Sequence, residues 1–236
     1  MDNWLPPAIR DRRALLWLPA YAMFRQHASL FLDFRDRAHE LSEEEFAKVY
    51  ETIHGIVIER KTDLTPASLE KVLAEVEGPT VLEVGCGNGY LAERIAERGL
   101  RVTASDIFLD PDLERRHPQI AFSAASVHAL PFEDASFDTV VSTHTLEHVL
   151  DLPGAVRELR RVARRRLVIA VPRQRPYRYT FDLHVHFFPY AFNVVGAMGP
   201  QGPYRCTEHG GDWVYVEDIA AAPARAAADP SVATTS

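Results

Sequence analysis

The glycine-rich stretch V-L-E-V-G-C-G-N-G at residues 81–89 constrains the fold more than any other part of the chain. A short apolar run precedes the glycines, and residues 91–98 after them are typical of a helix that ends at Gly99. A strand, a glycine turn and a helix in this order make half of a βαβ nucleotide-binding unit. Glycine permits positive φ and a close approach of a ligand to the main chain. The sequence therefore predicts a nucleotide-type site at this turn.

The spacing of the glycines distinguishes two classes of nucleotide-binding protein. A dinucleotide-binding fold has the pattern G-x-G-x-x-G, whose third glycine would fall at the position of Tyr90. This chain instead has G-x-G-x-G, preceded by an acid at Glu83. The order E-V-G-C-G-N-G resembles the first motif of class I S-adenosylmethionine-dependent methyltransferases.

Two later stretches resemble further motifs of that family. Residues 130–141 are similar to its "L-P-F" segment followed by an "S-F-D-x-V" strand. Ser126 stands where the family usually carries an aspartate that holds the adenine amino group. The ending L-E-H-V at 146–149 resembles the small-molecule branch, which includes quinone-biosynthesis and natural-product methyltransferases. The resemblance covers about residues 65–190.

The resemblance and the hydrophobic pattern together predict an α/β fold. We expect a Rossmann-like, doubly wound, mostly parallel seven-stranded sheet with an antiparallel closing hairpin and extra N-terminal helices. Helices are expected to begin at the capping box of Ser42 and Glu45, at Thr65 followed by Pro66, and at Pro153. The expected strands lie at residues 81–84, 101–105, 120–124, 137–142, 167–172, 204–207 and 212–216.

The pattern divides the chain into three parts. Residues 1–64 mix aromatic side chains with arginines and are expected to form an N-terminal helical cap, or a lid over the substrate. Residues 65–219 correspond to the S-adenosylmethionine-binding methyltransferase domain that the resemblance implies. Residues 220–236 are mostly Ala, Pro, Ser and Thr and are expected to be disordered.

The resemblance implies a site for S-adenosylmethionine, which methyl transfer converts to S-adenosylhomocysteine. Asp106 ends a predicted strand about 20 residues after the glycine turn, where a βαβ fold brings an acid to a ribose. An aspartate at such a place is also typical of a turn or a helix N-cap. The cofactor-binding residues that the resemblance implies are Glu83, Gly85, Cys86, Gly87, Asn88, Gly89, Asp106, Ile107, Ser126, Val127 and Thr143.

Histidines after the fourth predicted strand are the candidate catalytic groups. Methyl transfer to a hydroxyl needs a base to take the proton, and histidine, with a pKa of about 6.5, suits that task. His148 is the first candidate and His144 the second, with packing or capping of a helix as the alternative role of His148. Tyr21, His184 and His186 are candidates for substrate contact. The expected reaction is methylation of a small molecule on a hydroxyl oxygen, with nitrogen or carbon left open.

Composition narrows the choice of partners. The chain has 26 Lys and Arg against 33 Asp and Glu, and this net charge of −7 argues against a nucleic-acid partner. Cys86 and Cys206 are too few for a disulfide framework and favour a cytoplasmic location. The apolar run at 15–24 is too short to span a membrane, and no signal peptide is evident. Aromatic stretches near both ends favour a partly apolar, ring-containing acceptor, aromatic or glycosylated, whereas oligomeric state and pathway are left open.

Two other kinds of function stay open from sequence alone. A nicotinamide oxidoreductase would share the βαβ unit and Asp106, but Tyr90 and the "L-P-F" segment argue against it. A non-catalytic binding or scaffold protein could retain the same fold.

Two clusters of charged or metal-ligating residues have unremarkable interpretations. The arginines between positions 157 and 166 are expected to line the solvated face of a helix, with binding of an anionic substrate group as the alternative. No metal site is predicted, because several metal-ligating side chains lack the close spacing of a ligand set: Asp182, His184, His186, Cys206 and His209.

Overall fold

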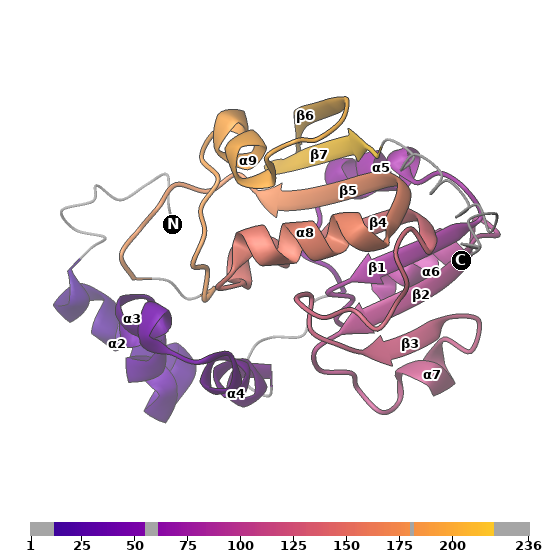
Figure 1. Ribbon diagram of the computed structural model, residues 1–236. Helices are drawn as coiled ribbons and strands as arrows, with labels where there is room; N and C mark the ends of the chain where they lie inside the picture. Colours follow the sequence, from indigo (N-terminus) through magenta and orange to yellow (C-terminus); the bar gives the residue numbers. More distant parts are fainter. Residues whose placement is uncertain (1–11, 55–60, 180–181, 220–236) are drawn as a thin grey trace, which may run out of the picture.

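The computed structural model of the chain describes residues 12–54, 61–179 and 182–219. Within them, seven strands form one sheet in the order β3-β2-β1-β4-β5-β7-β6 (Figure 1). Strands β1 to β5 run parallel, and β7 runs antiparallel to both β5 and β6. The predicted fold is confirmed. The strands are β1 Thr80–Val84, β2 Arg101–Asp106, β3 Ala121–Ala124, β4 Phe137–Thr143, β5 Ala163–Pro172, β6 Tyr204–His209 and β7 Asp212–Asp218.

The strand order reverses between β1 and β4. The chain moves outward from β1 through β2 to β3, and then returns to pair β4 with the other side of β1. Val84 at the end of β1 is level with Ser105 of β2 and Ser142 of β4. Ligands of open parallel sheets bind beyond the carboxyl ends of the strands at such a switch point. The fold therefore places a site directly after β1, β2 and β4.

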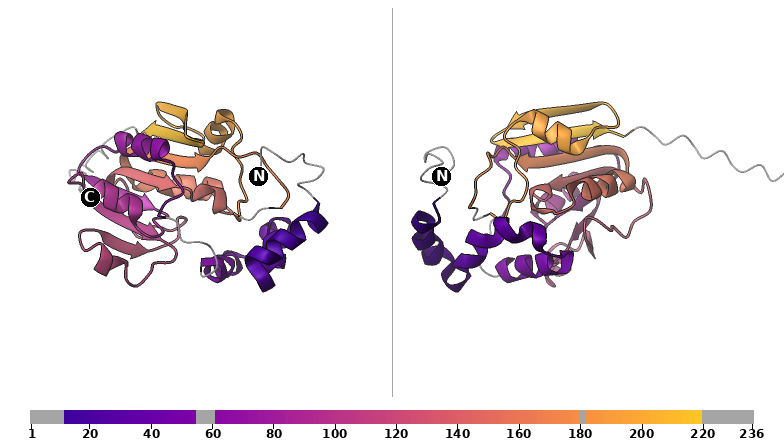
Figure 2. Two further views of the ribbon diagram at one scale, coloured as in Figure 1. Left: turned by 180° about the vertical axis from the view of Figure 1, so that it is seen from behind. Right: turned by 60° about the vertical axis from the view of Figure 1, so that its left-hand side comes forward.

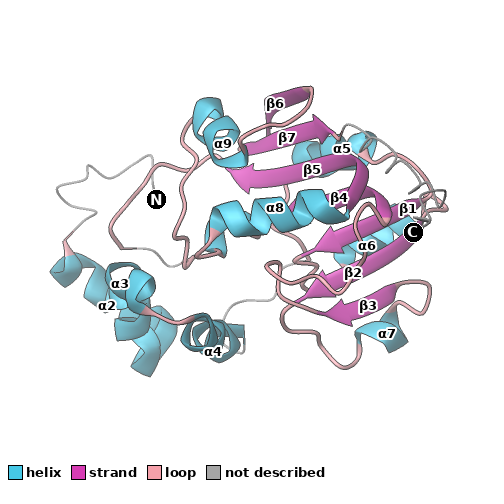
Figure 3. Cartoon of the chain, in the orientation of Figure 1, coloured by secondary structure: helices cyan, strands magenta, loops and turns pink. Residues whose placement is uncertain are grey.

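Helices cover both faces of the sheet (Figure 3). Helices α5 (Pro66–Glu75) and α6 (Tyr90–Ala96) pack against one face, and α8 (Leu152–Val162) and α9 (Ala191–Met198) pack against the other. The short α7 (Leu113–Arg116) connects β2 to β3. Successive side chains of a strand point to opposite faces, so strands covered on both sides are apolar throughout. Successive residues of the central strands therefore belong alternately to two cores. Those on the α5 side include Val81, Val141 and Val168, and those on the α8 side include Leu82, Val140 and Leu167.

Side chains at the N-termini of two of these helices supply their caps. Thr65 Oγ1 accepts a hydrogen bond from the Ser68 amide at 3.3 Å, and Pro66 occupies the first helical position of α5. Asp151 Oδ1 accepts from the Gly154 amide at 3.0 Å at the start of α8. Such caps satisfy amides that have no partner within the helix. The helix start predicted at Thr65 is confirmed.

A second group of helices lies beside the sheet, at the end toward which β1 to β3 point (Figures 1 and 2). Its own core includes Phe31, Leu32 and Phe34, and Tyr179 and Leu183 from the loop between β5 and α9 pack against it. The helices predicted for this region are confirmed. Their bounds are α2 Arg13–Phe24, η1 Arg25–His27, α3 Ala28–Arg37, η2 Ala38–Glu40 and α4 Glu43–His54, where η marks a 3₁₀ helix.

The capping box predicted before α4 is also present. The Ser42 amide donates to Glu45 Oε2 at 2.9 Å, and the Glu45 amide donates to Ser42 Oγ at 3.3 Å. The two residues thus satisfy one another's amides, which fixes where the helix begins.

The arginine run differs from the sequence prediction. Strand β5 begins at Ala163, so Arg164 and Arg166 lie in the strand and not on α8. Arg164 pairs with Asp138 at 2.5 Å, and Arg166 pairs with Asp218 at 2.8 Å. These ion pairs lie at the amino end of β5, opposite the end where a ligand would bind. The predicted solvated helix face is therefore wrong for Arg164, Arg165 and Arg166, which lie in the strand, and for Arg160, whose side chain is 10% exposed and pairs with Glu217.

The expected domain boundary after residue 64 stays a prediction. Leu64 packs into the core under α5 and α6, so the sheet body begins at or before this residue. The tail at 220–236, which was expected to be disordered, lies outside the described residues, as do residues 1–11. Among the helices that the structure describes, none has the length and apolar character needed to cross a membrane.

Candidate functional site

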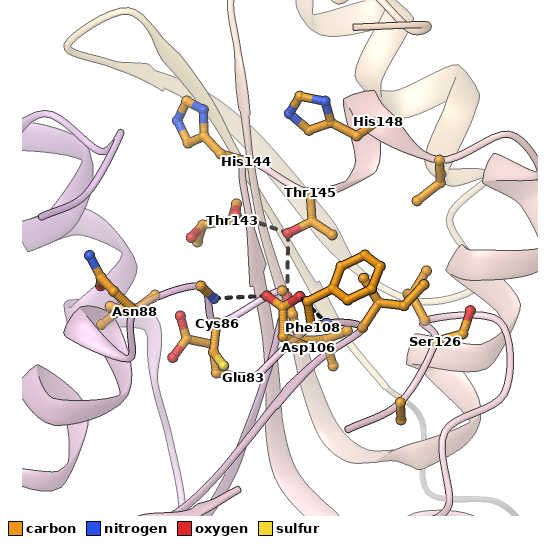
Figure 4. Close-up of a pocket in the computed structure, with 18 of the residues that line it drawn as sticks. Glu83, Cys86, Asn88, Asp106, Phe108, Ser126, Thr143, His144, Thr145 and His148 are labelled. Atoms are coloured by element: carbon orange, nitrogen blue, oxygen red, sulfur yellow. Dashed lines mark hydrogen bonds between the residues drawn. The ribbon is translucent and has the colours of Figure 1, made fainter. Parts of the chain in front are cut away.

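A cavity of about 630 Å³ opens where β1, β2 and β4 end. This volume lies in the range of small-molecule sites. Most of the residues singled out from the sequence line it, and they follow the ends of four strands, β1 to β4 (Figure 4). These residues are Glu83, Gly85, Cys86, Gly87, Asn88, Asp106, Ile107, Ser126, Val127, Thr143, His144 and His148.

The glycine turn after β1 forms one wall of the cavity. Gly85 has φ +80°, and a Cβ built there would lie 2.0 Å from Thr145 Oγ1, so only glycine fits. Gly87 has φ +52°, and a Cβ there would meet nothing within 4 Å. Gly87 therefore leaves its main chain open to the cavity, as expected of a turn that a ligand approaches closely.

Asp106, at the end of β2, is fixed by two main-chain donors. Its Oδ2 accepts from the Gly87 amide at 2.8 Å, and its Oδ1 accepts from the Phe108 amide at 3.2 Å (Figure 4). The second bond is a local turn interaction of the kind that aspartate favours. Asp106 thus takes the turn role weighed from the sequence and also lines the cavity, whereas its contact with a ribose stays a prediction.

Glu83 is a buried acid in the cavity wall. The residue is 2% exposed, and among the described residues its Oε2 has no hydrogen-bond partner. Burial raises the pKa of Glu83 well above its usual range, and the nearby charge of Asp106 raises it further. A buried polar atom without a partner fits a ligand that brings a donor. Together with the open main chain at Gly87, this wall suits a polar cofactor.

The opposite rim carries Ser126 and Val127. The Ser126 hydroxyl accepts a hydrogen bond from the His128 amide at 3.3 Å. His128 also lines the cavity, and its Nε2 lies 3.0 Å from the Asp151 carbonyl oxygen. The hydroxyl that replaces the family's usual aspartate therefore helps to shape this rim.

His144 lies between two carboxylates. Its Nδ1 is 3.4 Å from Glu147 Oε1, and its Nε2 is 3.2 Å from Asp212 Oδ1 of β7. Burial lowers the pKa of His144, but the contacts with Asp212 and Glu147 outweigh it and raise the pKa to about 10. An imidazolium cannot accept a proton, so His144 is a poor general base at neutral pH.

His148 lies on the cavity wall with a second histidine behind it. It ends the 3₁₀ helix η3 (Leu146–His148), and its ring centroid is 4.6 Å from that of His184. Burial and, to a smaller extent, the neighbouring His148 lower the pKa of His184 to about 4. In Figure 4, His144 and His148 lie on the side of the pocket away from Glu83 and Cys86.

Four residues singled out from the sequence do not line the cavity. Gly89 is buried at the start of α6, and Tyr21 stacks on Trp17 at a centroid distance of 5.1 Å on the outer face of α2. His184 lies behind His148, and His186 Nε2 donates to the Val149 carbonyl oxygen at 2.8 Å. Neither histidine therefore lines the cavity, and their contact with the substrate stays a prediction.

Several lining residues were not found from the sequence. Nine of them lie within two positions of a predicted site residue, and that proximity is the signal that would have found them: Val84, Tyr90, Leu91, Phe108, Ala125, His128, Thr145, Val149 and Leu150. The others carry no motif, because the fold brings them from α4 and the segment before α5: Glu44, Phe46, Lys61, Thr62 and Asp63.

Comparison with known proteins finds a family that resembles the part of the chain around this site. Residues 82–170 match a family described as a methyltransferase domain. A ubiquinone biosynthesis O-methyltransferase from Methylocella silvestris is 41% identical over 92 residues, which make up 35% of this chain and 34% of the relative. The chain spans less than half the length of the curated relatives that it matches.

Solved structures share the fold at low sequence identity. An S-adenosylmethionine-dependent methyltransferase from Aquifex aeolicus is 17% identical, with a TM-score of 0.53 over 76% of this chain and 100% of that one. A 1,6-didemethyltoxoflavin-N1-methyltransferase from Burkholderia thailandensis, solved with S-adenosylhomocysteine, is 18% identical. Its TM-score is 0.51 over 82% of this chain and 89% of that one.

Proposed function

We propose that this chain, which contains a class I S-adenosylmethionine-dependent methyltransferase domain, methylates a hydroxyl oxygen of a small-molecule acceptor. One observation carries the proposal: a single cavity is lined both by the glycine turn with Asp106 and by His148. The bound cofactor supplies a methyl group that is already activated by a sulfonium. The protein then needs to orient the reactants, exclude water and take up a proton.

The cofactor half of the cavity is proposed to work through positioned polar groups. Asp106 would accept hydrogen bonds from the ribose hydroxyls, since its carboxylate is held in place by the Gly87 and Phe108 amides. Glu83 has a buried oxygen that needs a donor. Ser126 and Val127 at the opposite rim would contact the adenine ring.

His148 is the proposed proton acceptor. It lines the cavity, whereas the two carboxylates beside His144 keep that residue protonated. A ring nitrogen of His148 would take the hydroxyl proton as the oxygen attacks the methyl group.

The acceptor is proposed to carry an aromatic ring. Phe46, Phe108 and Leu150 give the cavity apolar walls that suit such a ring. Oxygen is favoured over nitrogen or carbon because relatives at about 40% identity are named O-methyltransferases. Phe46 and Lys61 also place part of residues 1–64 at the cavity, which supports their role as a lid. The free thiols of Cys86 and Cys206 are consistent with a cytoplasmic reaction.

Calorimetric titration with S-adenosylhomocysteine tests the cofactor site. We expect wild-type protein to bind, and Asp106→Ala to bind at least tenfold more weakly, a loss of about 1.4 kcal/mol. Asp134→Ala is the matched control, because Asp134 is an exposed aspartate outside the cavity. Folded protein that gives no heat with S-adenosylhomocysteine or with S-adenosylmethionine would refute the proposed enzymatic function and favour a non-catalytic scaffold.

A second experiment identifies the accepting atom. Protein is incubated with S-adenosylmethionine carrying a carbon-13 methyl group and with a panel of hydroxylated aromatic compounds. The chemical shift of the transferred methyl group distinguishes oxygen, nitrogen and carbon acceptors. We expect an O-methyl signal that His148→Gln reduces about 100-fold or more.

A further inference from the structure

Behind the cavity wall, Glu147, His148 and His184 bring three metal-ligating side chains together. One ligand atom from each residue lies within 4.8 Å of the other two. Glu147 is fully buried, His184 is 7% exposed, and His148 lines the cavity. The sequence could not indicate this group, because His184 comes from a loop that follows β5 and only the fold brings it to η3.

The Glu147 carboxylate is buried and, within the described part of the chain, has only histidines to balance its charge; burial raises its pKa, but these histidines outweigh burial and hold the pKa below its usual value. Among the described residues, neither of its oxygens has a hydrogen-bond donor. The nearest cation is His144, whose Nδ1 at 3.4 Å makes an ion-pair contact. His144 is also shared with Asp212, so one imidazolium serves two buried carboxylates. A second cation would balance the group, since a buried carboxylate is costly unless it is paired or coordinates a metal.

The orientation of His184 is set by a chain of hydrogen bonds. Its Nδ1 donates to Gln174 Oε1 at 2.5 Å, and Gln174 Nε2 donates to the Tyr177 hydroxyl at 2.9 Å. Tyr177 in turn donates to Asp182 Oδ2 at 3.1 Å. A neutral imidazole that donates through Nδ1 presents Nε2 as a lone pair. Metal-bound histidines are typically fixed in this way by a partner on the other ring nitrogen.

The main chain holds the two parts of the group together. The amides of Val185 and His186 donate to the Glu147 carbonyl oxygen at 2.9 and 3.1 Å. The loop that carries His184 is thereby attached to η3. Ligand atoms of a tetrahedral zinc site lie roughly 3.4 Å apart, given zinc bonds of about 2.0–2.2 Å. The ligand atoms of this group lie within 4.8 Å of one another, so an ion would draw them closer together.

We propose that Glu147, His148 and His184 bind a divalent transition-metal ion of the zinc or ferrous iron type. Two histidines and one carboxylate form the ligand set of catalytic zinc and non-haem iron sites, which keep positions open for another ligand. Calcium and magnesium prefer oxygen ligands alone and fit this set poorly. Since His148 faces the cavity, an open position of the ion would face it too.

The catalytic role of the ion rests on the proposed methyl transfer, whereas binding of the ion does not. An ion at this wall would bind the acceptor hydroxyl and lower its pKa. His148 would then serve as a ligand instead of the proton acceptor proposed above, and the hydroxyl proton would pass to water in the cavity.

Titration with Co²⁺ tests the site without any activity assay. Chelator-treated, dialysed full-length protein is titrated while the visible absorption of bound cobalt is recorded. We expect one bound ion per chain, with affinity at least tenfold lower in Glu147→Gln and His184→Gln. His209→Gln is the matched control, because His209 lies on β6, outside this group. Since the variants of buried residues can fail to fold, His148→Gln provides a third test from the cavity side.

A parallel titration with S-adenosylhomocysteine separates the two proposals. Protein that binds S-adenosylhomocysteine but no cobalt overturns the metal site and leaves the proposed function intact. Protein that binds cobalt but no S-adenosylhomocysteine leaves the metal site intact and overturns the proposed function. Equal cobalt affinity in folded wild-type protein and all three ligand variants would place the ion elsewhere and overturn the proposal.

Discussion

His144 shows at the residue scale how a motif can be recognised while its role is misjudged. The histidine follows β4 directly, as the sequence predicts, and its side chain reaches the cavity. Its backbone has φ +49°, a left-handed conformation that is uncommon for histidine and is often retained at functional sites. Contacts with Asp212 and Glu147 raise its pKa to about 10 and favour the imidazolium. We therefore propose that the residue supports buried acids and does not act as the base.

The raised pKa of His144 makes stability depend on pH in a defined direction. Burial opposes the shift, but Asp212 and Glu147 raise the pKa to about 10, against about 6.5 in the unfolded chain. Its stabilising effect is therefore complete below about pH 6.5 and is lost as the pH rises to about 10. We expect His144→Gln to lower the free energy of unfolding by about 2 kcal/mol near pH 6 and by little near pH 10.

Urea unfolding of wild type and variant at several pH values measures this difference. His39→Gln is the control, because His39 is exposed on the surface and should change the free energy of unfolding by less than about 0.5 kcal/mol. If the difference in free energy of unfolding between wild type and His144→Gln grew as the pH rises, the assignment of His144 as a cation would be contradicted.

Site residues were predictable where they lie within a local motif. The glycine turn and Asp106 follow from the order of strand, turn and acid, which depends on neighbouring residues alone. Whether each contacts the cofactor as expected stays a prediction. The group of Glu147 and His184 could not be predicted, because a loop of irregular structure brings the histidine to η3 and nothing in its spacing indicates the partner.

At the scale of elements, α8 and the hairpin are joined by a buried ion pair. Arg160 donates through Nε and Nη2 to Glu217 Oε2 at 3.0 and 2.7 Å. Glu217 is fully buried on β7 and also accepts from the Tyr215 hydroxyl at 2.8 Å. Burial alone would raise the pKa of Glu217, but the bonds from Arg160 and the Gln201 amide hold it below its usual value.

Removing the arginine should leave a buried carboxylate without its cation. We expect Arg160→Leu to lower the free energy of unfolding by about 3 kcal/mol. Affinity for S-adenosylhomocysteine in the folded variant should be unchanged, because Arg160 lies outside the cavity. Arg157→Leu on the same helix is the control, since Arg157 is 69% exposed and should cost under about 0.5 kcal/mol. Equal losses in the two variants would show that the buried pair contributes nothing specific.

Element boundaries were predictable where side chains cap a helix. Thr65 and Ser42 fix the starts of α5 and α4 through their own hydroxyl groups, and such signals are local. The start of β5 was misplaced because the acidic partners of Arg164 and Arg166 lie on the neighbouring strands β4 and β7, and the local sequence does not reveal these ion pairs. Helix α9 was not predicted, because its apolar residues follow aromatic loop residues without an N-terminal cap.

At the scale of the whole molecule, the N-terminal helices support the loop that carries His184. Arg35 of α3 donates to the Tyr177 carbonyl oxygen, and its guanidinium lies 4.2 Å from the ring centroid of Phe187. Arg178 on the same loop pairs with Asp36 at 3.1 Å. The fold of the sheet could be expected from the resemblance, whereas this contact between distant segments could not.

This support predicts a long-range effect on the proposed metal site. We expect Arg35→Leu to lower the affinity for Co²⁺ roughly tenfold, because Tyr177 belongs to the chain that orients His184. Affinity for S-adenosylhomocysteine should be unchanged. Arg37→Leu, also on α3 but exposed, is the control. An Arg35→Leu variant that loses affinity for S-adenosylhomocysteine but keeps its affinity for Co²⁺ would contradict the inference that α3 supports the loop of His184.

The position of Asp212 has a consequence for the order of folding. This partner of His144 begins β7, a strand near the C-terminal end of the chain, and β7 inserts between β5 and β6. During synthesis, the glycine turn and the first five strands emerge well before Asp212 does. Pairing between such distant segments forms late, because closing a long loop costs entropy. A nascent chain can therefore shape the nucleotide-binding wall early, but the charged side of the pocket is completed only when the last hairpin joins the sheet.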